Sequence, residues 1–298
     1  MPAALVPVSD QLMTGAVAAY VLALVLYAFA YGPTRAATTG ASPGVLATMP
    51  PLAGRFGWLV AAGGACLHAG HLVTLGVAAG RAPWGTMGEF VSALVLSAVV
   101  ALLVLTRRER QSTRRHLGLF VMLPAVVGIA LATTVLYRPL PQLVPALHSY
   151  WIVIHVTTAI VAAGASTAGT VFAVLYLVRS RRDADASDDG AGRLPAAEVL
   201  NRLAHRTVVF AFPLWTFAIV TGAVWAEAAW GRYWGWDPKE TWAFIAWVAY
   251  AAYLHARSTA GWKSRRAAVI CCVAYACVLF NLVVVNVWLN GLHSYAGL

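Results

Sequence analysis

Charged residues and cysteines are scarce in this chain of 298 residues, and their scarcity excludes several classes of protein. Only 11% of the residues are charged, whereas 60% are hydrophobic. The four cysteines form no CxxC pair and all fall within apolar runs, so we expect neither a disulfide scaffold nor a thiolate metal site. No Walker loop, GxSxG elbow, GxGxxG turn or HExxH pair occurs. The sequence therefore lacks the catalytic apparatus of a soluble enzyme.

Long apolar runs dominate what is present, and the mean hydropathy is +0.72. Runs of membrane-spanning length lie at 11–31, 56–79, 88–106, 117–136, 150–178, 207–227, 241–256 and 267–289. The first run contains no charge and no small-residue cleavage site follows it, so we interpret it as a retained span. The segment between the fifth and sixth runs is charged, and we expect a solvated linker with a short helix near 195–205. The sequence predicts an all-α, polytopic membrane protein with about eight transmembrane helices.

The formal net charge of +10 reflects orientation in the membrane. Of the 21 lysines and arginines, 17 fall in the loops on one side of the predicted spans and 4 on the other. Cytoplasmic loops of membrane proteins are enriched in these residues. We therefore expect a multi-pass protein of the cytoplasmic membrane with both termini outside, and no nucleic-acid partner. Contact with membrane lipid is expected throughout.

A tryptophan-rich stretch, WGRYWGWDPKETW, occupies residues 230–242 on the predicted outer side. Asp237, Pro238 and Glu240 have the spacing of a helix start with a capping box. The free N–H groups of that helix, together with Lys239 and Arg232, favour an anion nearby. Two interpretations remain: an aromatic belt at the membrane interface with an ordinary cap, or a platform for a large flat ligand with carboxylates.

Histidines near the tryptophans indicate which ligand such a platform could hold. The predicted topology puts His155 and His293 at the outer interface, near the tryptophans, and His255 thirteen residues beyond Trp242, roughly 20 Å deeper. Two neutral imidazoles can bind haem iron axially, and the aromatic side chains suit the macrocycle. His148 is close enough in sequence to compete with His155.

Two further histidines, His68 and His71, lie three residues apart within the second apolar run. Residues with this spacing share a helix face. A hydrogen-bonded packing role and a role as metal ligands are both open for this pair.

Three segments resemble one family closely: AVWAEAAWGRYWGWDPKETWAFIAWVAYAAYLHAR, VPALHSYWIVIHV and GLHSYAG. They are similar to the CcsA/ResC proteins of system II cytochrome c biogenesis, labelled CcsB in some bacteria, which handle haem through a tryptophan-rich WWD domain. The resemblance covers about residues 140–298. It implies a four-helix membrane region at 1–136 and a haem-handling region at 137–298, with the WWD segment at 225–247 facing outward.

The resemblance implies the haem-handling subunit of a holocytochrome c synthase, or cytochrome c haem lyase, that binds haem b as substrate at up to two sites. His155 and His293 resemble the axial ligands of an outer haem, and His255 resembles one ligand of an inner haem. The platform for the outer haem would comprise Trp230, Trp234, Trp236, Asp237 and Trp242. No residue resembles a catalytic nucleophile or acid, so the expected role is positioning.

The implied partners are a companion ResB-like membrane subunit, apocytochrome c with its CxxCH motif, and a thiol-reducing thioredoxin-like protein. The companion is the favoured source of the second inner haem ligand, with His68 and His71 as alternatives within the chain. The competing functions are a haem exporter or chaperone of the system I type and a b-type electron-transfer subunit.

Overall fold

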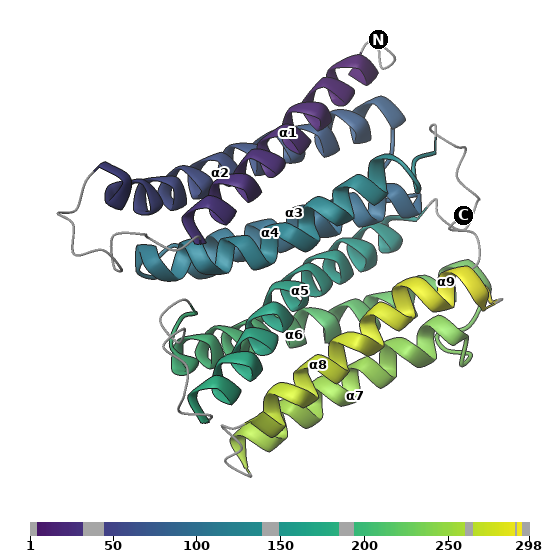
Figure 1. Ribbon diagram of the computed structural model, residues 1–298. Coiled ribbons are helices and arrows are strands. Elements are labelled where there is room, and N and C mark those ends of the chain that lie inside the picture. Colours follow the sequence, from purple (N-terminus) through teal and green to yellow (C-terminus); the bar gives the residue numbers. More distant parts are fainter. Residues whose placement is uncertain are drawn as a thin grey trace.

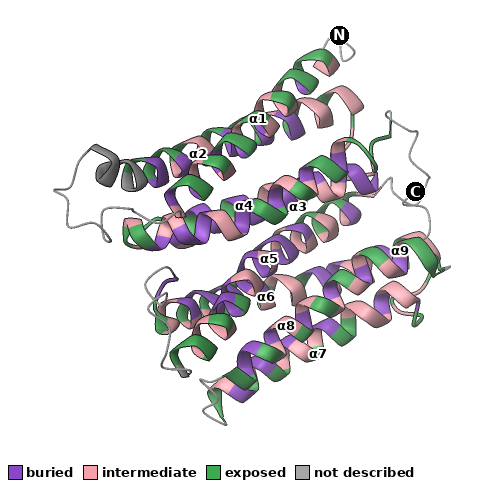
Figure 2. Ribbon diagram, in the orientation of Figure 1, coloured by how far each residue is buried: buried purple, intermediate pink, exposed green. Residues whose placement is uncertain are grey.

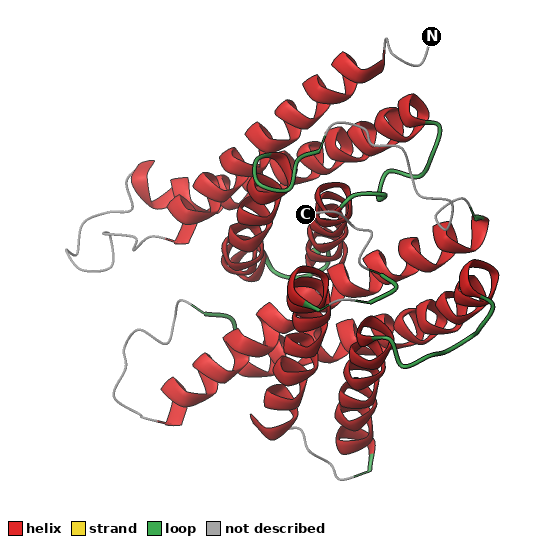
Figure 3. Cartoon of the chain, turned by 90° about the vertical axis from the view of Figure 1, so that its right-hand side faces the viewer, coloured by secondary structure: helices red, strands yellow, loops and turns green. Residues whose placement is uncertain are grey.

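The computed structural model describes residues 5–31, 45–138, 149–184, 194–259, 265–289 and 291–293, with only the backbone described for 45–51 and 184. All regular secondary structure in these ranges is helix, joined by short loops (Figure 3). Apolar runs in a membrane form helices because a helix satisfies its backbone hydrogen bonds internally. The all-α prediction is confirmed.

Successive long helices run roughly antiparallel, and α9 continues in the direction of α8 (Figure 1). They are α1 (Leu5–Tyr31), α2 (Val45–Ala79), α3 (Met87–Thr106), α4 (Gln111–Thr133), α5 (Tyr150–Ala184), α6 (Ala197–Trp230), α7 (Pro238–Ser258), α8 (Arg265–Leu279) and α9 (Val285–Trp288). A π-helical turn, η5 (Phe280–Val284), joins α8 to α9, so these three elements form one continuous rod. The start of α1 and the end of α9 lie at the same end of the bundle (Figure 1).

Among the described residues, seven helices are long and apolar enough to cross a membrane: α1 to α6 and the rod from Arg265 to Trp288. The remaining long helix, α7, has 21 residues and is not in that set. Large exposed apolar side chains cover the outward helix faces, as expected of a surface in contact with lipid. The chain is a multi-pass membrane protein, and each predicted run coincides with a helix, although the runs 117–136 and 267–289 extend past the helix ends at Thr133 and Trp288.

The helix predicted near 195–205 is present, but it is the start of a longer helix and not a separate short one, and residues 185–193 of the predicted linker lie outside the described residues. Helix α6 begins at Ala197 and continues without a break to Trp230. Leu200 and Leu203 in its first turns are fully buried against the bundle. Their packing against the bundle adds to the helix preference of the alanines and leucines in this segment.

The helices pack as neighbouring pairs, α1 with α2, α3 with α4, α5 with α6 and α7 with α8, and α3 and α5 join the two halves. One hydrophobic core runs from Tyr20 in α1 to Val278 in α8. Buried residues face the spaces between pairs and exposed residues cover the outside (Figure 2). The division into regions 1–136 and 137–298 remains a prediction.

Close packing in the first half depends on a glycine. A Cβ atom at Gly118 in α4 would overlap the ring of Tyr27, which is fully buried. Small residues at such contacts let helices approach each other closely in membranes. The α1–α4 contact therefore depends on a missing side chain.

We expect Gly118→Ala to lower the thermal unfolding temperature of the chain in detergent, because Tyr27 must move out of a packed core. Gly63→Ala is the matched control: Gly63 is exposed in α2 and a Cβ there meets no neighbouring atom. The control should unfold at the wild-type temperature or above it. Equal destabilisation by both changes would contradict this account of the α1–α4 contact.

Candidate haem site

The WWD loop, residues 231–237, connects α6 to α7 and is closed at both ends by local hydrogen bonds. Gly231 ends α6 in the left-handed conformation, with φ of 71°, where glycine is favoured. At the other end, Asp237 caps α7 and Glu240 Oε2 accepts from the backbone N–H groups of Gly235 and Asp237 at 2.8 and 3.1 Å. The predicted capping box is confirmed.

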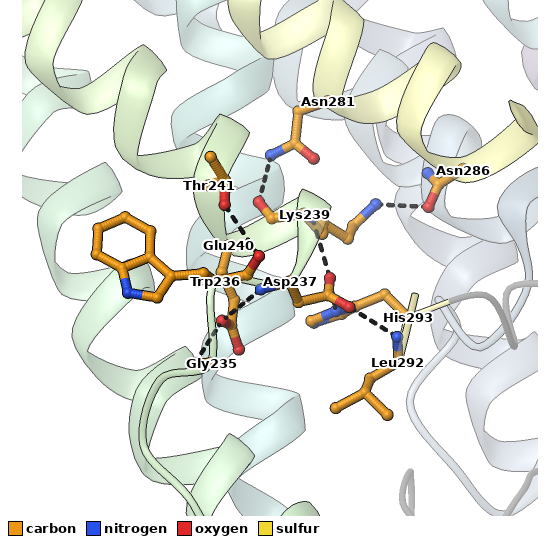
Figure 4. Close-up of polar contacts among 10 residues, drawn as sticks. All are labelled: Gly235, Trp236, Asp237, Lys239, Glu240, Thr241, Asn281, Asn286, Leu292 and His293. Carbon is orange, nitrogen blue, oxygen red and sulfur yellow. Dashed lines mark hydrogen bonds and ion pairs between the residues drawn. The ribbon is translucent and has the colours of Figure 1, made fainter. Parts of the chain in front are cut away.

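Asp237 connects the WWD loop to the C-terminal turn (Figure 4). Its Oδ1 accepts from the backbone N–H of Lys239 at 3.0 Å and from His293 Nδ1 at 2.9 Å. Its Oδ2 accepts from the backbone N–H of Leu292 at 2.7 Å. Burial acts to raise the pKa of Asp237, but the hydrogen bonds from His293, Lys239 and Leu292 outweigh it and lower the pKa to about 2. The carboxylate therefore stays ionised.

His155 projects from α5 toward α6. Its Nδ1 donates to the carbonyl oxygen of Ala218 at 2.7 Å, which places the imidazole lone pair on Nε2. The ring stacks on Trp225 with a centroid distance of 6.2 Å and an interplanar angle of 5°. A Cβ atom at Gly222 would lie 2.7 Å from two atoms of this ring. The glycine is therefore the reason the imidazole can lie flat along α6.

Trp225 brings the two predicted axial histidines together. Its ring centroid lies 5.7 Å from that of His293, in addition to its stacking on His155. Trp230 packs edge-on against both Trp225, at 4.7 Å, and His293, at 4.9 Å. The two imidazoles and two indoles thus form one contiguous aromatic group drawn from α5, α6 and the C-terminal turn.

This aromatic group opens on a cavity of about 890 Å³. Its volume lies within the range of small-molecule and cofactor sites. His155 and His293 both line it, together with Trp225 and Trp234. Further walls come from the α2–α3 loop, the first half of α3, the start of α7 and the rod formed by α8, η5 and α9.

The other predicted platform residues lie in different surroundings. Trp236 is 67% exposed, with φ of 58°, and points away from the Asp237 cluster (Figure 4). It packs edge-on against Trp234 and Phe244. Trp242 lies against Phe280, with 3.9 Å between ring centroids. Neither Trp236 nor Trp242 is part of the cavity lining.

His255 lies in the last turn of α7, exposed on the outer surface of the bundle. Seventeen residues separate it from Pro238 at the start of the helix, which corresponds to roughly 25 Å. His255 is thus remote from the cavity that holds His155 and His293. His148 lies outside the described residues, so its competition with His155 remains a prediction.

Both ring nitrogens of His68 are hydrogen bonded inside the bundle. Nδ1 pairs with Tyr20 Oη at 3.2 Å and Nε2 with Ser92 Oγ at 2.8 Å, and the side chain is fully buried. His71 Nδ1 pairs with Ser9 through its hydroxyl and its carbonyl oxygen, each at 2.9 Å. These contacts favour the packing role for His68, since a histidine with both nitrogens engaged has none for a metal. For His71 they engage Nδ1 alone, so both roles stay open for it.

Several residues around the cavity were not singled out by the sequence. Trp225 begins the predicted WWD segment at 225–247 but was given no role, and Gly222 carried no local signal. Asn281 and Asn286 also line the cavity, one in η5 and one in α9. A signal existed for these two, because polar side chains within an apolar run commonly mark functional positions in membrane proteins.

Fold and site together define a polytopic helical membrane protein with an imidazole- and indole-lined cavity at one end of the bundle. Residues 84–293 match the model of the family described as cytochrome C assembly protein. The match spans more than half of the chain, which belongs to this family.

Curated relatives named cytochrome c biogenesis protein CcsA are similar over shorter stretches. The protein of Parasynechococcus marenigrum is 40% identical over 175 residues, 51% of this chain and 57% of its own length. That of Synechococcus elongatus is 34% identical over 232 residues, 63% of this chain and 71% of its own length. The chain thus spans a little over half the length of the first of these relatives.

A solved structure, the cytochrome c haem lyase CcmF, shares the fold. It superposes with a TM-score of 0.63 over 95% of this chain and 46% of its own, at 17% identity. At that identity the likeness concerns the arrangement of helices alone.

We expect Asp237→Asn to lower the unfolding temperature by several degrees at pH 7, because it removes the charge while keeping a good capping side chain. The pKa of Asp237 is lowered from 3.8 to about 2, so the carboxylate contributes fully above about pH 4 and loses its contribution as the pH falls through 2. The difference between variant and wild type should therefore shrink from pH 4 toward pH 2.

Asp10→Asn, at an exposed position in α1, is the matched control for this measurement. Thermal unfolding of all three proteins across that pH range provides the comparison. A difference for Asp237→Asn that stays constant down to pH 2 would contradict the assigned role of the carboxylate.

Proposed function

We propose that this chain is the haem-handling subunit of a system II holocytochrome c synthase and that the cavity holds haem b between His155 and His293. One observation supports this above all. Both histidines line a single aromatic cavity, and each donates Nδ1–H to a fixed acceptor, a carbonyl or a carboxylate. This is the arrangement that orients metal-binding imidazoles in proteins, because it fixes the tautomer and the ring plane.

Haem supplies an iron that accepts imidazole nitrogens and two vinyl groups that add thiols. The chain's own residues hold the imidazoles in place: Ala218 and Asp237 orient them, Trp225 spaces them, and Gly222 makes room for His155. In the thioether step, a cysteine sulfur of apocytochrome c bonds to one vinyl carbon and the thiol proton ends on the other. The addition needs no external oxidant or reductant, so positioning is the protein's main contribution.

The same proposal places the WWD loop and both chain ends on the outer face of the cytoplasmic membrane. The asymmetry of lysine and arginine supports this orientation, with 17 on the inner side and 4 on the outer. Helix α7 then crosses the membrane as the eighth span, from the WWD loop to His255. Reduced apocytochrome c, kept so by a thioredoxin-like protein, meets the cavity from outside.

His255 would be one ligand of a second, inner haem, with the other ligand from a ResB-like companion subunit. The side chain of His255 is exposed on the side of α7 that faces away from the bundle, where another subunit can reach it. The hydrogen bonds that engage both ring nitrogens of His68 support the same conclusion, because they leave this in-chain alternative without a nitrogen for iron.

We expect His293→Ala to lose haem from the outer site while the protein still inserts and folds, because the iron then lacks one axial ligand. The measurement is the haem-to-protein ratio of the purified chain co-expressed with its companion. His205→Ala is the control, since His205 packs against Tyr253 and lies outside the cavity lining. Unchanged haem content and cytochrome c maturation in His293→Ala would overturn the assignment.

Gly222→Ala tests the second ligand without removing it. The new methyl group would displace the ring of His155, so we expect a shift of bound haem from low spin toward high spin. Absorption and electron paramagnetic resonance spectra report this change, and Gly63→Ala should leave both spectra unaltered. A low-spin spectrum in Gly222→Ala identical to that of wild type would count against His155 as a ligand.

A further inference from the structure

One wall of the cavity is polar, and it lies where α7 meets the rod of α8, η5 and α9. We call it the Lys239 wall; its members are Lys239, Glu240, Asn281 and Asn286, all of which line the cavity. Lys239 Nζ donates to Asn286 Oδ1 at 2.6 Å, and Asn281 Nδ2 donates to the backbone carbonyl of Lys239 at 3.1 Å (Figure 4). Asn286 thus holds the ammonium group of this lysine, and Asn281 holds its backbone.

The π-helical turn explains how both asparagines reach Lys239. They are five residues apart, a spacing that a regular α-helix separates by more than a full turn. Asn281 lies within the π-helical turn and Asn286 follows it in α9. Single π-helical turns of this kind occur frequently at functional sites.

The ammonium group of Lys239 has a neutral partner where a buried charge usually has an ionic one. Within the residues that the structure describes, it forms no ion pair, although Asp237 lies nearby. The carboxylate of Asp237 already accepts from His293, Leu292 and the backbone N–H of Lys239. The other cation that lines the cavity, Arg81, is paired with Glu89 at 2.6 Å. Among the described residues that line the cavity, Lys239 is therefore the cation available to a ligand.

Two buried acceptors on the same wall have no hydrogen-bond partner in the described structure. They are Asn281 Oδ1, on a residue 6% exposed, and Glu240 Oε1, on a residue 9% exposed. Buried polar atoms are costly when left unsatisfied. The wall consequently suits a ligand group that brings hydrogen-bond donors with its negative charge, such as a carboxylate with bound water or paired with a protonated carboxyl.

We infer that the Lys239 wall binds the carboxyl groups of the cavity's ligand, an inference that rests on the proposed function and identifies these groups as the two propionates of haem. Lys239 supplies the positive charge, and Asn281 and Glu240 accept from the accompanying donors. The start of α7 is a poorer anion site than its position suggests, because the side chain of Asp237 already accepts from its first free N–H group. The edge of the macrocycle that carries the propionates would therefore face the Lys239 wall.

Binding of metal-free porphyrins tests this wall separately from the histidines, because no axial ligation takes part. The probes are protoporphyrin IX, which has two carboxyl groups, and its dimethyl ester, titrated into the purified full chain by quenching of tryptophan fluorescence. We expect wild type to bind the diacid roughly tenfold or more tightly than the ester. Lys239→Gln should lose most of this preference while its affinity for the ester stays the same.

Arg138→Gln is the matched control, since it removes one positive charge at an exposed position outside the cavity lining. It should keep the wild-type preference for the diacid. The comparison of acid and ester in wild type stands without any variant, and thermal unfolding checks that Lys239→Gln is folded.

Equal affinity of wild type for both porphyrins, or a folded Lys239→Gln that keeps the full preference for the diacid, would overturn the inference about the wall alone. Failure of wild type to bind either porphyrin or haem would overturn the proposed function with it. The two failures are therefore distinguishable.

Discussion

The structure depends on the carboxylate of Asp237. It caps the helix that follows the WWD loop, holds the C-terminal turn through Leu292, and orients His293 at the cavity. Through this one side chain, the loop and the adjacent start of α7 meet the turn at residues 291–293, which is more than fifty residues away in the sequence. Because the three hydrogen bonds stabilise the ionised form, the group stays charged across the physiological range.

The membrane explains why so much of the site is organised in advance. Polar groups in an apolar surrounding are costly unless they are paired, and the described structure pairs nearly all of those near the cavity. Ala218 engages His155, Asp237 engages His293, and Asn286 engages Lys239. What remains, the Nε2 lone pair of His155 and the acceptors of the Lys239 wall, lies at the surface that a ligand would contact. These unpaired groups are the ones that a bound ligand would engage.

Much of the fold followed from the sequence because membrane spans are continuous apolar runs. The helix start at Asp237 also followed, since a capping box is a local pattern. The continuity of the helix expected near 195–205 with the following span did not, because the burial of Leu200 and Leu203 against the bundle is a tertiary contact. Nor did the roles of Trp225 and Gly222, which depend on α5 and α6 lying side by side. The sequence identified the pair His155 and His293, but which tryptophans face the cavity is a matter of backbone geometry at the WWD loop.

The central claim is that His155 and His293 hold haem in one cavity, and the absorption spectrum of the purified chain tests it most directly. The chain is expressed with and without its companion subunit, and its spectrum is recorded oxidised and after reduction with dithionite. The account predicts a low-spin spectrum typical of haem b with two histidine ligands, and more haem when the companion is present. A folded protein that stays colourless in both preparations would contradict it.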